Sequence, residues 1–137
     1  MTINIHIFEK IITDTFHLGF TKKDYSVFEK YNSSEVQYRI KGQNFSVTVA
    51  DAIYMLDNWH ASFSNFTTRV DKIVIQDNEA VALIMYSGLH TGKFRNIEPT
   101  NKQMSFEAVL FFTFKDNKVV AIREVFDEGA LLSSISA

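Results

Sequence analysis

The sequence predicts an α+β protein in which helices come first and a curved, mostly antiparallel sheet comes last. In the first half of the chain apolar residues recur every three or four positions, whereas in the second half they recur every second position. Short polar turns join the later strands, which favours antiparallel neighbours. A chain of 137 residues, 46 % of them hydrophobic, can bury a core of its own, so we expect a single domain over residues 1–137.

Three helices are expected before the main sheet. The first carries an apolar stripe through Ile5, Phe8, Ile12 and Phe16 and should end near Gly19. The other two should begin at capping pairs, in which an acid follows a threonine by three residues: Thr21 with Asp24, and Thr48 with Asp51. A short strand at 35–40 should separate these two helices, because its apolar residues alternate.

Four longer strands are expected at 66–76, 81–90, 103–114 and 119–127, followed by a last helical turn. The polar segments DNEA and KDNK should be hairpin turns between neighbouring strands. Alternation assigns the side chains to faces, and a bulge would reassign them. One face of the last strand should hold Val120, Ile122, Glu124 and Phe126, and the opposite face should hold Val119, Ala121, Arg123, Val125 and Asp127.

Composition excludes several kinds of chemistry. A formal net charge of -2 gives no basic field for nucleic acid, and the absence of cysteine excludes disulfides and thiolate nucleophiles. The four histidines lack the close spacing of zinc ligands, so no metal site is expected. Neither a targeting segment nor a membrane span is evident. We therefore expect a cytoplasmic protein with no nucleic-acid or membrane partner.

Several short motifs stand in a fixed order in the second half of the chain. They are WHASF at 59–63, HTGKF at 90–94, PTN at 99–101, FTFKDNKV at 112–119, and Asp127 followed by Leu131 and Leu132. In this order they resemble the SnoaL-like polyketide cyclases, which belong to the superfamily of nuclear transport factor 2 and ketosteroid isomerase. The resemblance implies a cone-shaped fold in which a curved mixed sheet wraps around a long N-terminal helix and leaves an apolar cavity.

The resemblance also implies an intramolecular aldol reaction that needs neither a metal nor an organic cofactor. A carboxylate at the cavity would act as general acid and base, and Glu124 or Asp127 can supply it. Two positions depart from the family pattern: Leu110 stands where many relatives have a polar residue, and Arg123 stands where many have tryptophan.

Three residues are the candidate catalytic groups, and each has a structural alternative. His90 is a proton donor in the cavity or a turn residue that satisfies loop backbone. Glu124 is a cavity acid or a paired core charge. Asp127 is a base or the N-cap of the last helical turn, and Arg123 could pair with it. Gly88 and Gly92 flank His90 and are expected to allow unusual backbone angles.

A hydrophobic small molecule is the expected ligand. The residues expected to contact it are Trp59, His60, Tyr86, Phe106, Leu110 and Phe112. Three functions remain open: a small cofactor-free cyclase, isomerase or hydrolase, a non-catalytic binder that uses the same cavity, and a dimeric interaction module. Under each of them the apolar outer sheet face predicts a homodimer, and the residues of that face are Val81, Leu83, Met85, Val109 and Phe111.

Overall fold

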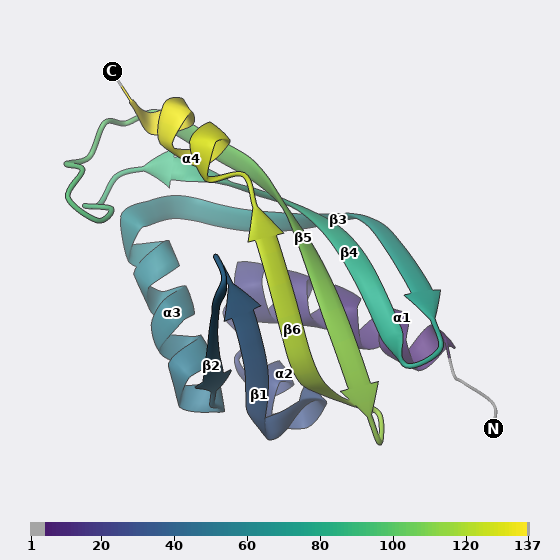
Figure 1. Ribbon diagram of the computed structural model, residues 1–137. Coiled ribbons are helices and arrows are strands. Elements are labelled where there is room, and N and C mark those ends of the chain that lie inside the picture. The colour runs from purple at the N-terminus through teal and green to yellow at the C-terminus, as the bar shows by residue number, and fades with distance from the viewer. Residues whose placement is uncertain (1–4, 137) are drawn as a thin grey trace.

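The computed structural model describes residues 5–136 and has the expected order of helices followed by a sheet (Figure 1). The helices are α1 (Ile5–Asp14), the π-helix η1 (Thr15–Thr21), α2 (Ser26–Tyr31), α3 (Val49–Ser62) and α4 (Glu128–Ile135). The strands are β1 (Asn32–Ile40), β2 (Gln43–Val47), β3 (Phe63–Gln76), β4 (Glu79–His90), β5 (Gln103–Lys115) and β6 (Lys118–Phe126). Every helix in residues 5–136 is too short or too polar to traverse a lipid bilayer.

The six strands form one sheet in the order β2-β1-β6-β5-β4-β3. Neighbours are antiparallel except for β1 and β6, which run parallel and join the first part of the chain to the last. The strands β3 to β6 form the predicted meander. In Figure 1 they bend around α1, which lies behind them. The α+β class and the mixed, mostly antiparallel sheet wrapped around the N-terminal helix are therefore confirmed.

Alternation along β4 and β5 buries one face of the sheet against the helices. The even-numbered residues from Ala80 to His90 and from Met104 to Phe114 are buried, and their odd-numbered neighbours are exposed or half-buried. On the helical side, Phe8, Ile12 and Phe16 are buried as predicted. Ile5 departs from the predicted stripe because half of its surface is exposed at the start of α1.

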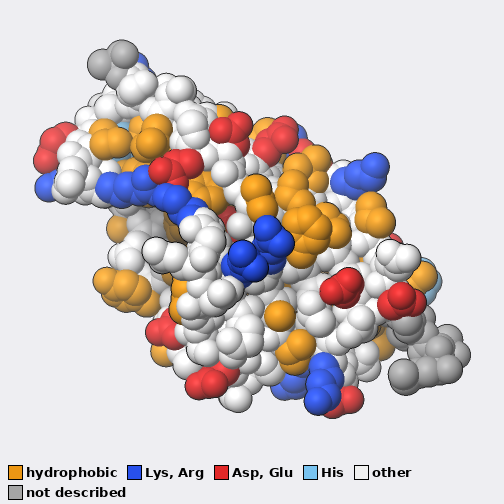
Figure 2. Space-filling view, viewed as in Figure 1, with side chains coloured by type: hydrophobic (Ala, Val, Ile, Leu, Met, Phe, Trp, Pro, Cys, Tyr) orange, Lys and Arg blue, Asp and Glu red, His pale blue; other side chains and the backbone are white. Residues whose placement is uncertain are grey.

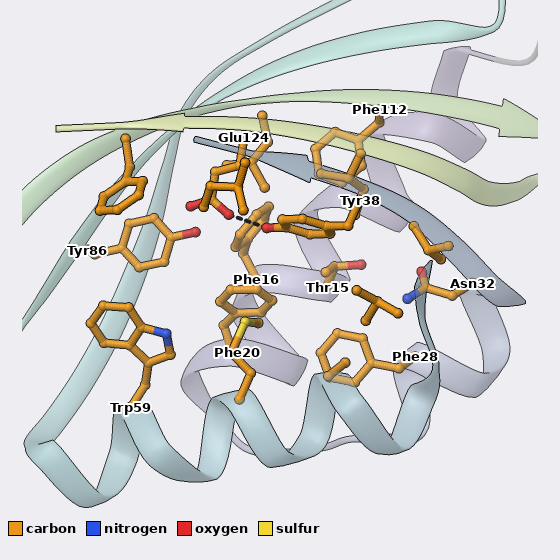
Figure 3. A pocket seen from close by; sticks show the side chains of 18 of the residues that line it. Thr15, Phe16, Phe20, Phe28, Asn32, Tyr38, Trp59, Tyr86, Phe112 and Glu124 are labelled. Carbon is orange, nitrogen blue, oxygen red and sulfur yellow. Dashed lines mark hydrogen bonds between the residues drawn. The ribbon is translucent and has the colours of Figure 1, made fainter. Parts of the chain in front are cut away.

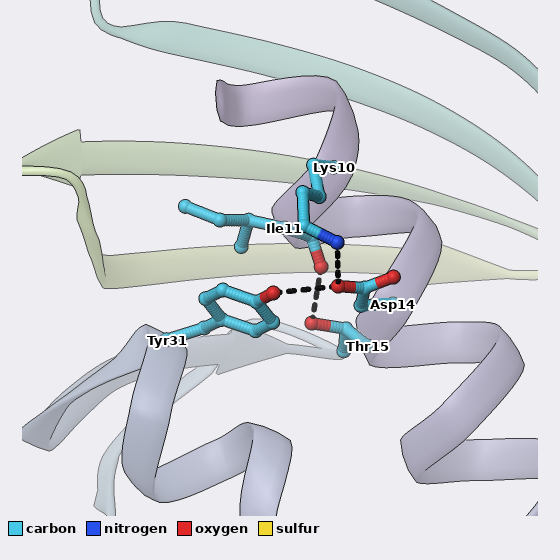
Figure 4. A network of polar contacts seen from close by, with 5 residues as sticks. All are labelled: Lys10, Ile11, Asp14, Thr15 and Tyr31. Carbon is cyan, nitrogen blue, oxygen red and sulfur yellow. Dashed lines mark hydrogen bonds and ion pairs between the residues drawn. The ribbon is translucent and has the colours of Figure 1, made fainter. Parts of the chain in front are cut away.

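The helical segment does not end at Gly19 but changes to a π-helix that runs to Thr21. A β-carbon at Gly19 would lie 2.8 Å from Val27 Cγ2, so the glycine lets η1 approach α2 closely. A polar network ties α2 to the end of α1 (Figure 4). The Tyr31 hydroxyl donates to Asp14 at 2.5 Å, and Lys10 donates to the same carboxylate at 2.9 Å.

The strand β2 was not predicted from the sequence. It forms a hairpin with β1 through Lys41 and Gly42, whose φ angles of 54° and 76° are the two positive values of a type I′ turn. The segment has only Phe45 and Val47 as alternating apolar residues, which is too short a pattern to distinguish from a loop.

A bulge in β6 changes the predicted faces of that strand. Phe114 pairs with Val119 whereas Thr113 pairs with Ala121, so Val120 is the extra residue. Val119 was predicted on the face opposite Glu124, and this is wrong because the bulge turns its side chain into the core, where it is 1 % exposed. The faces of Ile122, Glu124 and Phe126 are as predicted, because they lie beyond the bulge.

One of the two predicted capping pairs is present. The Thr48 hydroxyl accepts from the Asp51 N–H at 3.2 Å and the Asp51 carboxylate accepts from the Thr48 N–H at 3.0 Å, which is a capping box for α3. The prediction for Thr21 is wrong, because α2 starts later, at Ser26. Thr21 instead accepts a hydrogen bond from the Thr68 N–H at 2.9 Å and so ties η1 to β3.

Candidate functional site

A pocket of about 170 Å³ lies between the concave face of the sheet and the helices. Half of the residues that line it are aromatic: Phe16, Phe20, Phe28, Tyr38, Phe45, Trp59, Tyr86, Phe106, Phe112 and Phe126. Its rim includes Phe45 on β2 and Met55 on α3, which are partly exposed. Figure 3 shows that the few polar groups of the wall stand among these rings.

Glu124 brings a carboxyl group into this apolar pocket. It lies on β6 between Ile122 and Phe126, which point to the same side. Burial raises the pKa of the carboxyl because the charged form loses its hydration, and a hydrogen bond from Tyr38 lowers it in part. The net direction is upward, so Glu124 can accept and release a proton closer to neutral pH than an exposed glutamate can.

Tyr38 fixes the orientation of that carboxyl group. Its hydroxyl donates to Oε1 of Glu124, which leaves Oε2 available to a ligand (Figure 3). The ring stacks on Phe45 with centroids 5.7 Å apart. Burial, together with the negative charge of Glu124, holds the pKa of the Tyr38 hydroxyl well above its usual value, so the hydroxyl remains a donor.

Tyr86 places a second hydroxyl beside Glu124. Its ring stacks on Phe106 with centroids 4.7 Å apart and an interplanar angle of 3°, which fixes the direction of the O–H group. Burial and the charge of Glu124 raise the pKa of this phenol well above its usual value. Within residues 5–136 the hydroxyl has no hydrogen-bond partner, so it is free to donate to a ligand.

The opposite end of the pocket has polar groups of its own. Asn32, at the junction of α2 and β1, and Thr15, the first residue of η1, both line it (Figure 3). The Thr15 hydroxyl donates to the Ile11 carbonyl at 2.6 Å, which leaves its oxygen free to accept. The side-chain amide of Asn32 has no hydrogen-bond partner in the described part of the chain.

The structure does not bring His90 to the pocket. His90 is 0 % exposed, and its Nδ1 lies 3.2 Å from the Thr100 N–H and 2.9 Å from the Thr100 hydroxyl. Because a backbone N–H donates to Nδ1, the ring proton belongs on Nε2. That atom is buried beside Phe63 without a hydrogen-bond partner among residues 5–136. The geometry matches the alternative role, in which the side chain satisfies loop backbone.

The glycines on either side of His90 are needed for close approach rather than for unusual backbone angles. A β-carbon at Gly92 would lie 2.1 Å from the Ala61 carbonyl oxygen, and one at Gly88 would lie 2.8 Å from Phe63 Cβ. Neither glycine has a positive φ, so the expectation of special backbone geometry is wrong. Gly92 lets the loop after β4 lie directly against the end of α3.

Asp127 lies outside the pocket lining and caps α4. Its Oδ1 accepts from the Ala130 N–H at 2.9 Å, and its own N–H donates to the Glu107 carbonyl at 3.0 Å. The ion pairs found in residues 5–136 do not include one between Arg123 and Asp127. The capping alternative fits this geometry, and Glu124 is the carboxylate that faces the cavity.

Five of the six residues expected to contact a ligand line the pocket: Trp59, Tyr86, Phe106, Leu110 and Phe112. The sixth, His60, does not, because its Nε2 lies 2.7 Å from the Phe20 carbonyl and links α3 to η1. Within residues 5–136 no three His, Asp or Glu side chains gather closely enough to hold a metal ion.

Sequence reasoning missed Tyr38, Asn32 and the residues of η1. Tyr38 lies in the strand predicted at 35–40, but the parallel pairing of β1 with β6 was not visible in the sequence. That pairing sets Ile40 beside Glu124 and so brings Tyr38 to the carboxyl group. The polar residues 32–34 after α2 were the one available signal for Asn32, and a polar segment of this kind marks a loop as readily as a site.

The curved mixed sheet and the helices that it covers form an α+β fold of the ketosteroid isomerase-like class. A sequence profile of the SnoaL-like polyketide cyclases matches residues 11–135, so the chain belongs to that family. A search of curated protein sequences found no significant match.

Solved structures support the same fold at low sequence identity. AclR from Streptomyces galilaeus, assigned as a hydroxylase, superposes with a TM-score of 0.84 at 20 % identity, covering 96 % of this chain and 82 % of AclR. A protein from Jannaschia sp. CCS1, assigned as a SnoaL-like polyketide cyclase, gives 0.85 at 18 % identity, with 100 % and 98 % covered. TsrD from Streptomyces laurentii gives 0.86 at 13 % identity, with 99 % of each chain covered.

Proposed function

We propose that this chain is a cofactor-free enzyme that removes a proton next to the carbonyl of an apolar ligand. Glu124 is the general base and Tyr86 is the oxyanion donor. The observation that carries the proposal is a carboxyl group with a raised pKa inside an aromatic pocket, beside a phenol that is free to donate. Tyr38 is a positioning residue, because it acts through Glu124.

The proposed reaction begins with the ligand carbonyl oxygen accepting a hydrogen bond from Tyr86. Oε2 of Glu124 takes a proton from the adjacent carbon, and the electrons of that C–H bond form the enolate, whose charge is on the carbonyl oxygen. The enolate then recovers a proton from Glu124, which completes an isomerisation or an exchange. Alternatively its carbon attacks a second carbonyl in the same molecule, which closes a ring as in an aldol reaction. The alkoxide formed on the second carbonyl oxygen then takes the proton back from Glu124.

Deuterium exchange tests the proton transfer without knowledge of the natural substrate. A panel of one- to four-ring ketones, including α-tetralone, is incubated with the protein in D₂O, and exchange next to the carbonyl is followed by proton NMR. We expect the wild-type protein to exchange the ketone above the buffer rate. In Glu124→Gln this exchange rate should fall by at least about a hundredfold. Glu107→Gln, a matched change on an exposed residue of the outer face of β5, should keep the wild-type rate.

One observation favours a non-catalytic binder instead. Leu110, the β5 partner of Glu124 in the sheet, supplies an apolar side chain where a second polar group would assist proton transfer. A binder would take up ketones from the panel but leave their exchange at the buffer rate. Saturating binding without exchange would therefore overturn the enzyme proposal and support this one.

We also propose that the open face of the sheet binds a second copy of the chain. Strand register joins its apolar residues into one band, and Figure 2 shows hydrophobic side chains gathered there. The band consists of Val74, Val81, Leu83, Met85, Val109, Phe111 and Val125. Arg39 and Arg123 lie side by side on β1 and β6, with Arg123 next to Phe111, and Glu79 and Glu107 lie on β4 and β5. A two-fold pairing can set these opposite charges against each other.

A further inference from the structure

The pocket separates its polar groups into two sets at opposite ends. The catalytic end holds the carboxyl of Glu124 with the hydroxyls of Tyr38 and Tyr86 (Figure 3). The far end holds Asn32 and Thr15, and the space between the two ends is walled by rings and aliphatic side chains. A ligand that fills the space has an apolar body and can make hydrogen bonds at both ends.

The far end is left unsatisfied by the protein itself. In the described part of the chain the Asn32 amide has no partner, although a side-chain amide can donate twice and accept twice. The Thr15 oxygen keeps accepting capacity after it donates to Ile11. A ligand that covers these two groups removes them from water, and leaving them unpaired in the complex is then costly. A ligand hydroxyl or amide would satisfy them, whereas a hydrocarbon end would leave them without partners.

The volume limits the size of the enclosed ligand. The pocket holds about 170 Å³. Pockets for drug-sized ligands are commonly about 300–1,000 Å³, whereas an engineered cavity of about 150 Å³ takes benzene. The pocket is therefore suited to one or two rings. No lysine or arginine is among its lining residues in the described chain, so an anionic ligand would be buried without a countercharge.

We infer that the pocket takes a neutral one- or two-ring carbonyl compound that carries a hydroxyl or amide at the end remote from the carbonyl. The carbonyl lies at Tyr86, and the remote group lies at Asn32. This inference rests on the proposed function for the assignment of the catalytic end. The far end selects the ligand and sets its position along the pocket, so that the proton-bearing carbon faces Glu124.

Calorimetric titration of three probes tests the inference. They are α-tetralone, the derivative of α-tetralone with a hydroxyl para to the carbonyl, and progesterone, a four-ring ketone. We expect the hydroxylated probe to bind about three- to tenfold more tightly than α-tetralone, because it makes one more buried hydrogen bond. Progesterone should bind at least tenfold more weakly than either, because its rings exceed the enclosed volume.

Two variants test whether the far end causes the tighter binding of the hydroxylated tetralone. Asn32→Leu keeps the size of the side chain and should bring the affinity ratio of the two tetralones to about one. Thr15→Val is the second variant, in case Asn32→Leu fails to fold, and it should reduce the same ratio. A thermal denaturation curve near that of the wild type shows that each variant is folded.

The other outcomes count against the inference. Equal binding of the two tetralones, or an unchanged ratio in both variants, overturns the far-end assignment. Tighter binding of progesterone than of the tetralones overturns the size limit. Absence of binding by all three probes overturns the inference as a whole. The proposed base chemistry is judged separately, by deuterium exchange across the wider ketone panel, so the two failures can be told apart.

Discussion

At the scale of single residues, Glu124 combines burial among aromatic rings with one hydrogen bond, from Tyr38. Period-two alternation in the sequence was enough to place Glu124, Tyr86, Phe106 and Phe112 on the concave face. It could not identify Tyr38 as the partner of Glu124, because the two residues are 86 positions apart and meet only through the parallel pairing of β1 and β6.

Glu124 should make the stability of the protein depend on pH. In the unfolded chain the carboxyl has an ordinary pKa near 4.5, and burial raises its pKa in the folded state. Between these values the folded state binds more protons, so the free energy of unfolding falls as pH rises. The free energy of unfolding of Glu124→Gln, measured relative to that of the wild type, should therefore increase above pH 4.5. The increase should level off above the raised pKa.

Chemical denaturation at a series of pH values measures this difference. Glu9→Gln, a matched change at an exposed residue of α1 away from the sheet face, is the control. A difference between Glu124→Gln and the wild type that stays constant with pH would mean that the carboxyl is not buried as the structure shows.

At the scale of elements, Asp127 should act on α4 and not on the chemistry. Asp127→Ala removes the cap and should lower the free energy of unfolding by about 1 kcal/mol. Asp127→Asn keeps a capping oxygen and should stay near the wild type. Both variants should keep the wild-type exchange rate. Slower exchange in Asp127→Asn with unchanged stability would instead return Asp127 to the list of catalytic groups.

Gly92 should be the least replaceable glycine described. Alanine there would place a methyl group 2.1 Å from the Ala61 carbonyl oxygen, and the backbone would have to move. We expect Gly92→Ala to cost about 3 kcal/mol in chemical denaturation. Gly129→Ala is the matched control, since its β-carbon would meet only Asp127 Oδ1 at 3.6 Å, and it should be neutral or stabilising by up to about 1 kcal/mol. Equal costs would contradict the close packing of this loop.

The elements themselves differed in how well the sequence predicts them. The capping box at Thr48 and the long alternating strands are local signals, so they were predicted correctly. The π-helix and the hairpin to β2 were not predicted, and the sequence left a bulge open without placing it at Val120. Each of these depends on packing between segments distant in sequence, or on a pattern of too few residues.

At the scale of the whole molecule, the proposed dimer should depend on the centre of the apolar band. Phe111 is 44 % exposed there, and Phe111→Lys should convert a dimer into a monomer in sedimentation velocity. Tyr54→Lys is the control, because Tyr54 is 72 % exposed on α3, away from the sheet face. A wild-type protein that sediments as a monomer at high concentration would contradict the proposal.

The most direct test of the central claim is a carbon-13 NMR titration of the Glu124 carboxyl, assigned with Glu124→Gln. We expect its pKa to lie above that of an ordinary glutamate. It should rise further in Tyr38→Phe, because the hydrogen bond from Tyr38 stabilises the charged form and so lowers the pKa. If Glu124 has an ordinary pKa and Tyr38→Phe does not change it, Glu124 faces water. That result would contradict its assignment as the general base.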